Sequence, residues 1–164
     1  MLEIQEIKEI TFAKYGSSLD PLSGAKKPED LGAERVLFFP DRMLQTFATT
    51  NLIAFCPLII KPRELVIVDA ERHSFTEEVL GGFTEDVCFH VLPAQDGGPD
   101  LEKMEVFRLP AGWWVRLKRG VWHKAPFVLG NKATCGTVVL PPHTYTNDCE
   151  VVEFSQAYTI VKGD

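Results

Sequence analysis

The feature that most constrains the fold of this chain is the regular alternation of short apolar runs with glycine- and proline-containing turns. The runs are rich in β-branched and aromatic residues, which favour strands. The predicted strands are residues 36–39, 52–55, 65–68, 87–92, 104–109, 113–117, 137–140 and 151–154. No long stretch has helical periodicity, and only residues 11–15 and 101–104 are expected to form short helical turns. We therefore predict an all-β chain folded as a small barrel or jelly roll.

Length and composition fit one globular domain. The chain has 164 residues, of which 45% are hydrophobic and 24% charged, so it can bury a core of its own. Its longest apolar run, residues 52–60, is about half of what a membrane-spanning helix needs, and residues 1–10 lack the apolar stretch of a signal peptide. We predict a single cytoplasmic domain over residues 1–164. Residues 1–35 are expected to be an N-terminal extension and loop that pack on the barrel.

The charge balance limits the possible partners. A formal net charge of −6 disfavours a nucleic-acid partner, which requires a basic surface, and we predict no membrane partner. A local basic cluster stands against this background, and its members are Arg116, Lys118, Arg119 and Lys124. It indicates either a site for a small anionic ligand or a solvated strand edge, where lysines discourage aggregation.

The cysteines do not indicate a structural metal site. Cys56, Cys88, Cys135 and Cys149 form no C-x-x-C pair, which argues against structural zinc. In a reducing cytoplasm we expect them to be free thiols that behave as small core residues.

Four polar residues are candidates for a site inside the barrel. Glu71 and His73 are two residues apart and share a strand face. Glu78 follows five residues later, and His123 comes after a turn that contains Gly120. Two imidazoles and two carboxylates can hold a divalent ion. They can equally supply a base and an acid.

Two segments resemble the cupin motifs. In cupins, a first motif H-x-H is followed by three or four residues and Glu, and a second motif reads roughly P-x-G-x-x-H. Residues 71–78 resemble the first motif, with Glu71 in place of the first histidine. Residues 118–123 resemble the second, with Lys118 in place of the proline. The resemblance implies a cupin double-stranded β-helix.

A closer resemblance is to the ureidoglycolate lyase family, which is itself cupin-like. Its members carry F-x-x-Y-G near the start, then E-R-H, P-D-L, a segment near H-R-G-x-W-H-H-P, and N-C-D-V near the end. The corresponding segments here are residues 12–16, 71–73, 99–101, 119–126 and 147–151. The chain departs from the family where Lys118 and Lys124 replace histidines, and where residues 140–143 replace a late Asp-Arg.

The family resemblance implies a carbon–nitrogen lyase that splits ureidoglycolate into glyoxylate and urea. Such a reaction needs a base for the hydroxyl proton, an acid for the departing nitrogen and a cation for the carboxylate. A divalent ion, if present, assists by Lewis acidity. We assign that ion to Glu71, His73, Glu78 and His123, and expect no organic cofactor. Glu78 or His123 is the candidate base when it is not a ligand.

The remaining roles fall on the basic cluster and one tryptophan. Arg116 and Lys118 share a strand face and can clamp the carboxylate of a small-molecule substrate. Lys118 can instead donate a proton if burial lowers its pKa. Trp122 either walls the ligand cavity or simply buries apolar area.

Two other functions fit the same residues. One is a different metal-dependent cupin enzyme, such as an isomerase or a dioxygenase. The other is a non-catalytic module that binds a small anion. Fold analogy does not decide among them, because barrels of this kind host many activities. We also predict a homodimer, from the common preference for two-fold assemblies and from the family.

Overall fold

The computed structural model describes residues 1–23 and 36–162, and nearly all of its regular structure is β. The strands are β1 (Leu2–Glu6), β2 (Gly16–Leu19), β3 (Ala54–Ile60), β4 (Val66–Arg72), β5 (Glu78–Gly81), β6 (Val87–Leu92), β7 (Glu105–Leu109), β8 (Trp114–Leu117), β9 (Trp122–His123), β10 (Phe127–Val128), β11 (Thr134–Leu140) and β12 (Glu150–Val161). The short helices are α1 (Glu9–Phe12), the 3₁₀ turn η2 (Leu101–Lys103) and α2 (Thr144–Asn147).

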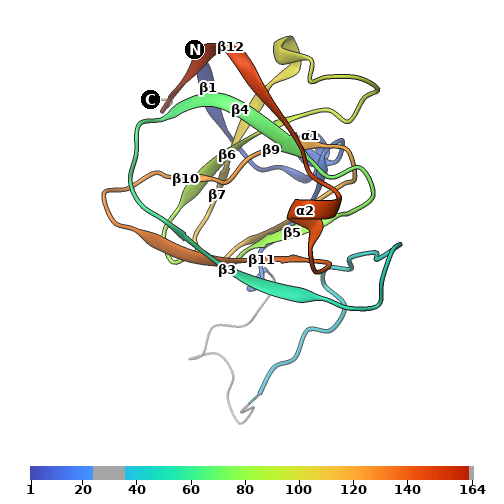
Figure 1. The fold of residues 1–164 in the computed structure, drawn as a ribbon. Coiled ribbons are helices and arrows are strands. Elements are labelled where there is room, and N and C mark those ends of the chain that lie inside the picture. Colours follow the sequence, from blue (N-terminus) through green and yellow to red (C-terminus); the bar gives the residue numbers. More distant parts are fainter. Residues whose placement is uncertain (24–35, 163–164) are drawn as a thin grey trace.

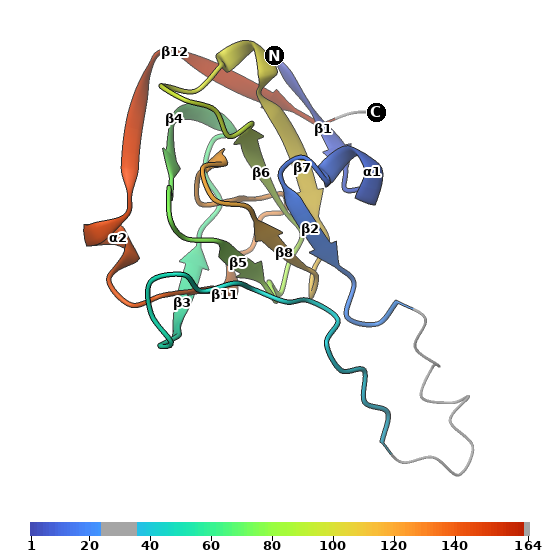
Figure 2. The same ribbon diagram turned by 90° about the vertical axis from the view of Figure 1, so that its right-hand side faces the viewer.

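These strands form two sheets that pack face to face (Figures 1 and 2). The larger sheet has the order β10-β6-β7-β1-β12-β4-β9, and the smaller has the order β2-β8-β5-β11-β3. In the larger sheet β9 pairs with both β4 and β6, so six of its strands close into a ring. The prediction of an all-β, cupin-type jelly roll is confirmed.

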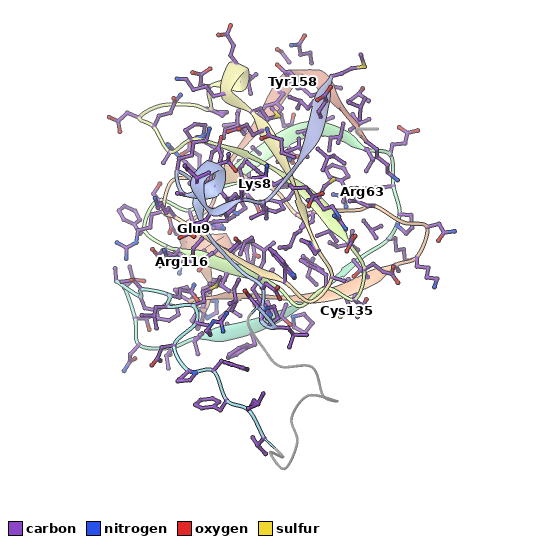
Figure 3. The ribbon with its side chains drawn as sticks, turned by 180° about the vertical axis from the view of Figure 1, so that it is seen from behind. Lys8, Glu9, Arg63, Arg116, Cys135 and Tyr158 are labelled. Carbon is purple, nitrogen blue, oxygen red and sulfur yellow. The ribbon has the colours of Figure 1, made fainter. Side chains whose placement is uncertain are left out.

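Strand alternation divides the apolar side chains between two cores. On β6, Phe89 and Val91 face the smaller sheet and join the core between the sheets. Cys88 and Leu92 point to the opposite face and join a second cluster around Trp122. Side chains fill both regions (Figure 3). A strand buried on both faces reads as a continuous apolar run, which is why residues 87–92 were predicted with the correct bounds.

Most predicted strands are present, but their bounds and surroundings differ. Residues 36–39 form no strand; Val36 and Phe38 are each 81% exposed. These residues favour strands, but a strand forms only where neighbouring strands pack against it, and residues 36–39 pair with no strand among the described residues. Pro57 follows the predicted strand 52–55 but lies within β3, the edge strand of the smaller sheet. An edge strand tolerates proline because one side of its backbone needs no partner.

The N-terminal residues are part of the sheets. β1 lies between β7 and β12, and β2 pairs with β8. Residues 1–19 therefore supply strands to both layers, which differs from the expected extension; residues 24–35 of that expected loop lie outside the described residues. Gly16 is the glycine of the F-x-x-Y-G segment, and the packing around it shows why glycine is required there. A Cβ on it would lie 1.7 Å from the Arg116 carbonyl oxygen, so only glycine allows β2 to approach β8.

The helical turns lie close to where they were expected. The first begins earlier than predicted, at Glu9, and Lys8 precedes it in extended conformation without a capping side-chain bond. The Thr11 hydroxyl donates to the Lys8 carbonyl. The second turn is confirmed over Leu101–Lys103, and the Asp100 side chain caps it.

In the described part of the chain, no helix is long and apolar enough to cross a membrane. The four cysteines are free thiols, as predicted. Only Cys88 among them is fully buried, whereas Cys135 is exposed.

Candidate functional site

Strand pairing brings three of the predicted polar residues together. Glu71 on β4 lies directly opposite His123 on β9. His73, one residue past β4, lies beside them, and the ligand atoms of all three lie within 4.8 Å of one another. The turn before β9 is fixed by Gly120, which has a positive φ of 75° and donates its N–H to the His73 carbonyl. One hydrogen bond therefore ties the two sequence motifs together.

Glu78 reaches the same cluster from the other sheet. It begins β5 in the smaller sheet, where it lies opposite Leu117 and shares its inward-facing side. Its Oε2 atom lies 3.2 Å from Nε2 of His73, and its Oε1 atom lies 3.6 Å from Nε2 of His123. His73, Glu78 and His123 are 2%, 5% and 4% exposed. The site is therefore a buried centre between the two sheets.

Backbone carbonyls fix the orientation of both imidazoles. Nδ1 of His73 lies 2.6 Å from the carbonyl oxygen of Asp148, and Nδ1 of His123 lies 2.9 Å from that of Val121. A carbonyl only accepts, so each Nδ1 carries a proton and donates it. Both Nε2 atoms consequently point into the cluster, and that of His123 has no hydrogen-bond partner among the described residues. A histidine held in this way is arranged as metal-binding histidines commonly are.

The charges of the buried groups are strongly coupled. Burial alone would raise the pKa of Glu78, but the positive charges of His123 and His73 and the hydrogen bond with His73 outweigh this effect and lower the pKa to about 2. Burial lowers the pKa of His123, but attraction to Glu78 outweighs it, so that the net pKa is raised. Glu78 is thus an anion at neutral pH. The Nε2 atoms of His73 and His123 face this anion, so a favourable interaction requires that they carry a proton or bind a metal ion.

The residues present fit a divalent metal ion. The donor set is two imidazole nitrogens with the carboxylate of Glu71, and Glu78 lies close enough to both imidazoles to add a fourth oxygen ligand. Mixed imidazole and carboxylate sets suit zinc, manganese and iron. The unpartnered Nε2 of His123 is the specific observation that favours a ligand, because a buried polar atom without a partner is costly.

Two further residues hold the ligand set in place. Nζ of Lys124 lies 2.8 Å from Oε2 of Glu71 and 3.4 Å from Oδ2 of Asp69. The backbone carbonyl of Asp148 accepts a hydrogen bond from the ring Nδ1–H of His73. The carboxylate of Asp148 accepts hydrogen bonds from the backbone N–H groups of Ser74 and Phe75. The turn after β4 is therefore anchored to the segment that precedes β12.

Sequence reasoning did not assign site roles to Asp148 or Tyr145. The ring of Tyr145, on α2, lies against His73 edge-on, with centroids 6.0 Å apart. Burial, followed by the charges of Glu78 and Glu71, raises the pKa of Tyr145, so its hydroxyl stays protonated at neutral pH. The one signal that could have pointed to this segment is its resemblance to the closing N-C-D-V of the family.

Arg116 and Lys118 are not brought to the buried cluster. On β8, Leu117 faces inward with Glu78, so Arg116 points to the outer face of the smaller sheet (Figure 3). Its guanidinium donates to the Leu44 carbonyl. Lys118 is exposed, and its ammonium donates to the Ala13 carbonyl. This placement does not support the predicted carboxylate clamp or the predicted role of Lys118 as a proton donor.

Trp122 also lies away from the cluster. It is fully buried, opposite Leu92, on the sheet face that points away from His123. The guanidinium of Arg72 lies 4.6 Å from the centre of its ring. Of the two predicted alternatives, this position favours a core residue over a wall of the ligand cavity.

The fold and the site define a cupin-type protein with a buried centre of histidines and carboxylates. The chain belongs to the ureidoglycolate lyase family, because the model of that family matches residues 1–161. A mutant of oxalate decarboxylase from Bacillus subtilis is a similar solved structure, with 16% identity and a TM-score of 0.43. The similarity covers 62% of this chain and 24% of that one, so the chain spans about a quarter of that protein. No curated protein matches the chain.

Proposed function

We propose that this protein is a ureidoglycolate lyase, which splits the carbon–nitrogen bond of ureidoglycolate to release glyoxylate and urea. Membership of the family supports the reaction. The observation that carries the assignment of the site is the Nε2 atom of His123, which is buried, unpartnered and directed at Glu78. Such an atom is suited to bind a ligand.

His73, His123 and Glu71 would hold a divalent ion in this proposal, because their ligand atoms converge. When bound, the ion would supply Lewis acidity at the hydroxyl and carboxylate oxygens of the substrate. The Asp148 and Val121 carbonyls keep both imidazoles in the tautomer that leaves Nε2 free. Lys124 holds Glu71 in position by its ion pair.

Glu78 is the proposed carrier of the proton. It is an anion at neutral pH and lies beside both imidazoles, so it can accept the hydroxyl proton of the substrate. The electron pair of that O–H bond forms the new carbonyl of glyoxylate, and the carbon–nitrogen bond breaks. The hydroxyl and the departing nitrogen are attached to the same carbon. A single carboxyl group can therefore pass the proton to the nitrogen and complete urea.

Release of glyoxylate from ureidoglycolate by the purified protein tests the proposal. We expect turnover in the wild type, loss of more than about 100-fold in His123→Ala, and a similar loss in Glu78→Gln. His143→Ala is the matched control, because His143 is exposed and lies outside the cluster. A wild type without turnover would contradict the proposal, as would a His123→Ala variant with full activity.

Metal analysis separates this function from its alternatives. Chelation followed by readdition of metal should abolish and then restore glyoxylate release. Iron together with oxygen consumption would indicate a dioxygenase instead, and tight binding of glyoxylate without turnover would indicate an anion-binding module.

The proposal includes a homodimer in a reducing cytoplasm. The free thiols support such a compartment. The edge strand β3 supports assembly, because it exposes 68% of Phe55 and 70% of Ile59 on its outer side. Sedimentation of the purified protein gives its mass in solution, and a monomer at micromolar concentration would contradict this part of the proposal.

A further inference from the structure

The helix α2 lines a surface hollow and also contacts the buried cluster. The hollow has a volume of about 340 Å³, and α2 contributes Thr144 and Asn147 to its lining. Tyr145, between them in sequence, points to the other side, where its ring lies against His73. Residues three apart share one helix face and the residue between them lies on another, so this division follows from the geometry of a helical turn.

Tyr145 lies at the boundary between the buried cluster and solvent. It is 52% exposed, whereas its ring contacts a histidine that is 2% exposed. Hydrogen bonds fix the chain on both sides of Tyr145. The Thr144 hydroxyl donates to the Pro141 carbonyl, and the Asp148 carbonyl accepts from the ring Nδ1–H of His73. The tyrosine is therefore held beside the cluster, with part of its side chain exposed to solvent.

We propose that the Tyr145 hydroxyl binds the ureido end of the substrate and orients it for departure; this inference rests on the proposed function. The hydroxyl and carboxylate end of ureidoglycolate would lie at the ion held by His73, His123 and Glu71, which leaves the ureido group to project towards Tyr145. A phenol hydroxyl both donates and accepts hydrogen bonds, and a ureido group offers a carbonyl acceptor and N–H donors. Tyr145 thus selects a substrate with an amide-like leaving group.

Two fragments of the substrate test this assignment by calorimetric titration of the purified protein. Ureidoacetate carries the ureido group and the carboxylate but lacks the hydroxyl, so it cannot be cleaved by the proposed reaction. Glycolate carries the hydroxyl and the carboxylate but no ureido group. In Tyr145→Phe we expect ureidoacetate to bind about tenfold more weakly, as expected for one lost hydrogen bond. Glycolate should bind as it does to the wild type.

Tyr158→Phe is the matched control, because it removes a phenol hydroxyl that accepts a hydrogen bond from the Gln156 side chain on the same strand, β12. It should bind both fragments like the wild type, and thermal unfolding should show that all variants are folded. Equal binding of ureidoacetate by Tyr145→Phe and the wild type would overturn the inference alone. So would an equal loss of affinity for both fragments, which would indicate a structural role. A wild type that releases no glyoxylate and binds neither fragment would overturn the proposed function as well.

Discussion

Nζ of Lys124 lies 2.8 Å from Oε2 of Glu71, so a cation stands directly beside one carboxylate of the buried cluster. The segment H-R-G-x-W-H-H-P, which residues 119–126 resemble, has histidine where this chain has Lys124. Lysine keeps its charge here, because attraction to Glu71 and Asp69 outweighs the effect of burial and raises its pKa. The fixed charge should oppose a second cation at the site.

We therefore predict that Lys124→Met binds Zn²⁺ about fivefold more tightly than the wild type, because a like charge is removed from the neighbourhood of the ligands. Competition with a chromogenic chelator measures the affinity. Lys132→Met is the control, since Lys132 is exposed in the turn before β11 and should leave the affinity unchanged. Weaker binding in Lys124→Met would mean that Lys124 matters more for holding Glu71 in place than for its charge.

Asp148 should contribute to both stability and metal affinity. Its carboxylate accepts two backbone N–H groups, from Ser74 and Phe75, directly after His73. In Asp148→Ala these donors lose their partner, and we expect the free energy of unfolding to fall by about 2 kcal/mol. The backbone carbonyl that accepts from the His73 ring remains in this variant, but the turn that follows His73 loses its anchor. Metal affinity should therefore fall about tenfold.

Chemical denaturation and metal titration measure these two effects of Asp148→Ala. Asp96→Ala is the control, because Asp96 is exposed in the loop between β6 and η2. A variant as stable as the wild type would show that the two hydrogen bonds contribute little to the fold.

The core between the sheets should not accept a larger residue at one position of β11. A Cβ on Gly136 would lie 2.4 Å from the ring of Phe83, which is 1% exposed and cannot move freely. We predict that Gly136→Ala lowers the free energy of unfolding by about 1–3 kcal/mol, as overpacking commonly does. Gly130→Ala is the control, because a Cβ there has no neighbour within 4 Å among the described residues. Equal denaturation midpoints for the two variants would contradict the prediction.

Sequence alone was sufficient to predict the cluster of Glu71, His73 and His123 but not the position of Arg116. Strand alternation states which residues share a face, and it correctly placed Glu71 with His73. It does not state which face points inward, because that depends on the partner strands. The register of β8 with β5 turns Leu117 inward and Arg116 outward, and no local pattern encodes that pairing.

The residues that support the cluster were harder to predict for a related reason. Asp148 is 75 residues away from His73 in sequence, and their contact is made through a backbone carbonyl. A carbonyl contact requires no particular side chain, so composition and spacing carry no signal for it. The apolar run at residues 36–39 shows the opposite case, in which a clear strand pattern finds no neighbouring strand.

His90 should make stability depend on pH. It is 1% exposed, its Nε2–H donates to the Asp69 carbonyl, and burial lowers its pKa to about 3 from an ordinary value of 6.5. Between these values the unfolded chain binds the proton and the folded chain does not, so stability rises with pH and is lost as pH falls. The contribution is about 1 kcal/mol per pH unit within that window. Glu78, with its pKa lowered to about 2, acts in the same direction below pH 4.5.

The variant His90→Gln separates the histidine from the other acid-sensitive groups, because glutamine can still donate to the Asp69 carbonyl but does not titrate. We predict that the free energy of unfolding of this variant, measured by urea denaturation from pH 6.5 to pH 4.5, falls less steeply than that of the wild type. The difference in slope should be about 1 kcal/mol per pH unit. His143→Gln, at an exposed histidine, should keep the wild-type slope. Parallel curves for His90→Gln and the wild type would show that His90 is protonated equally in the folded and unfolded chain.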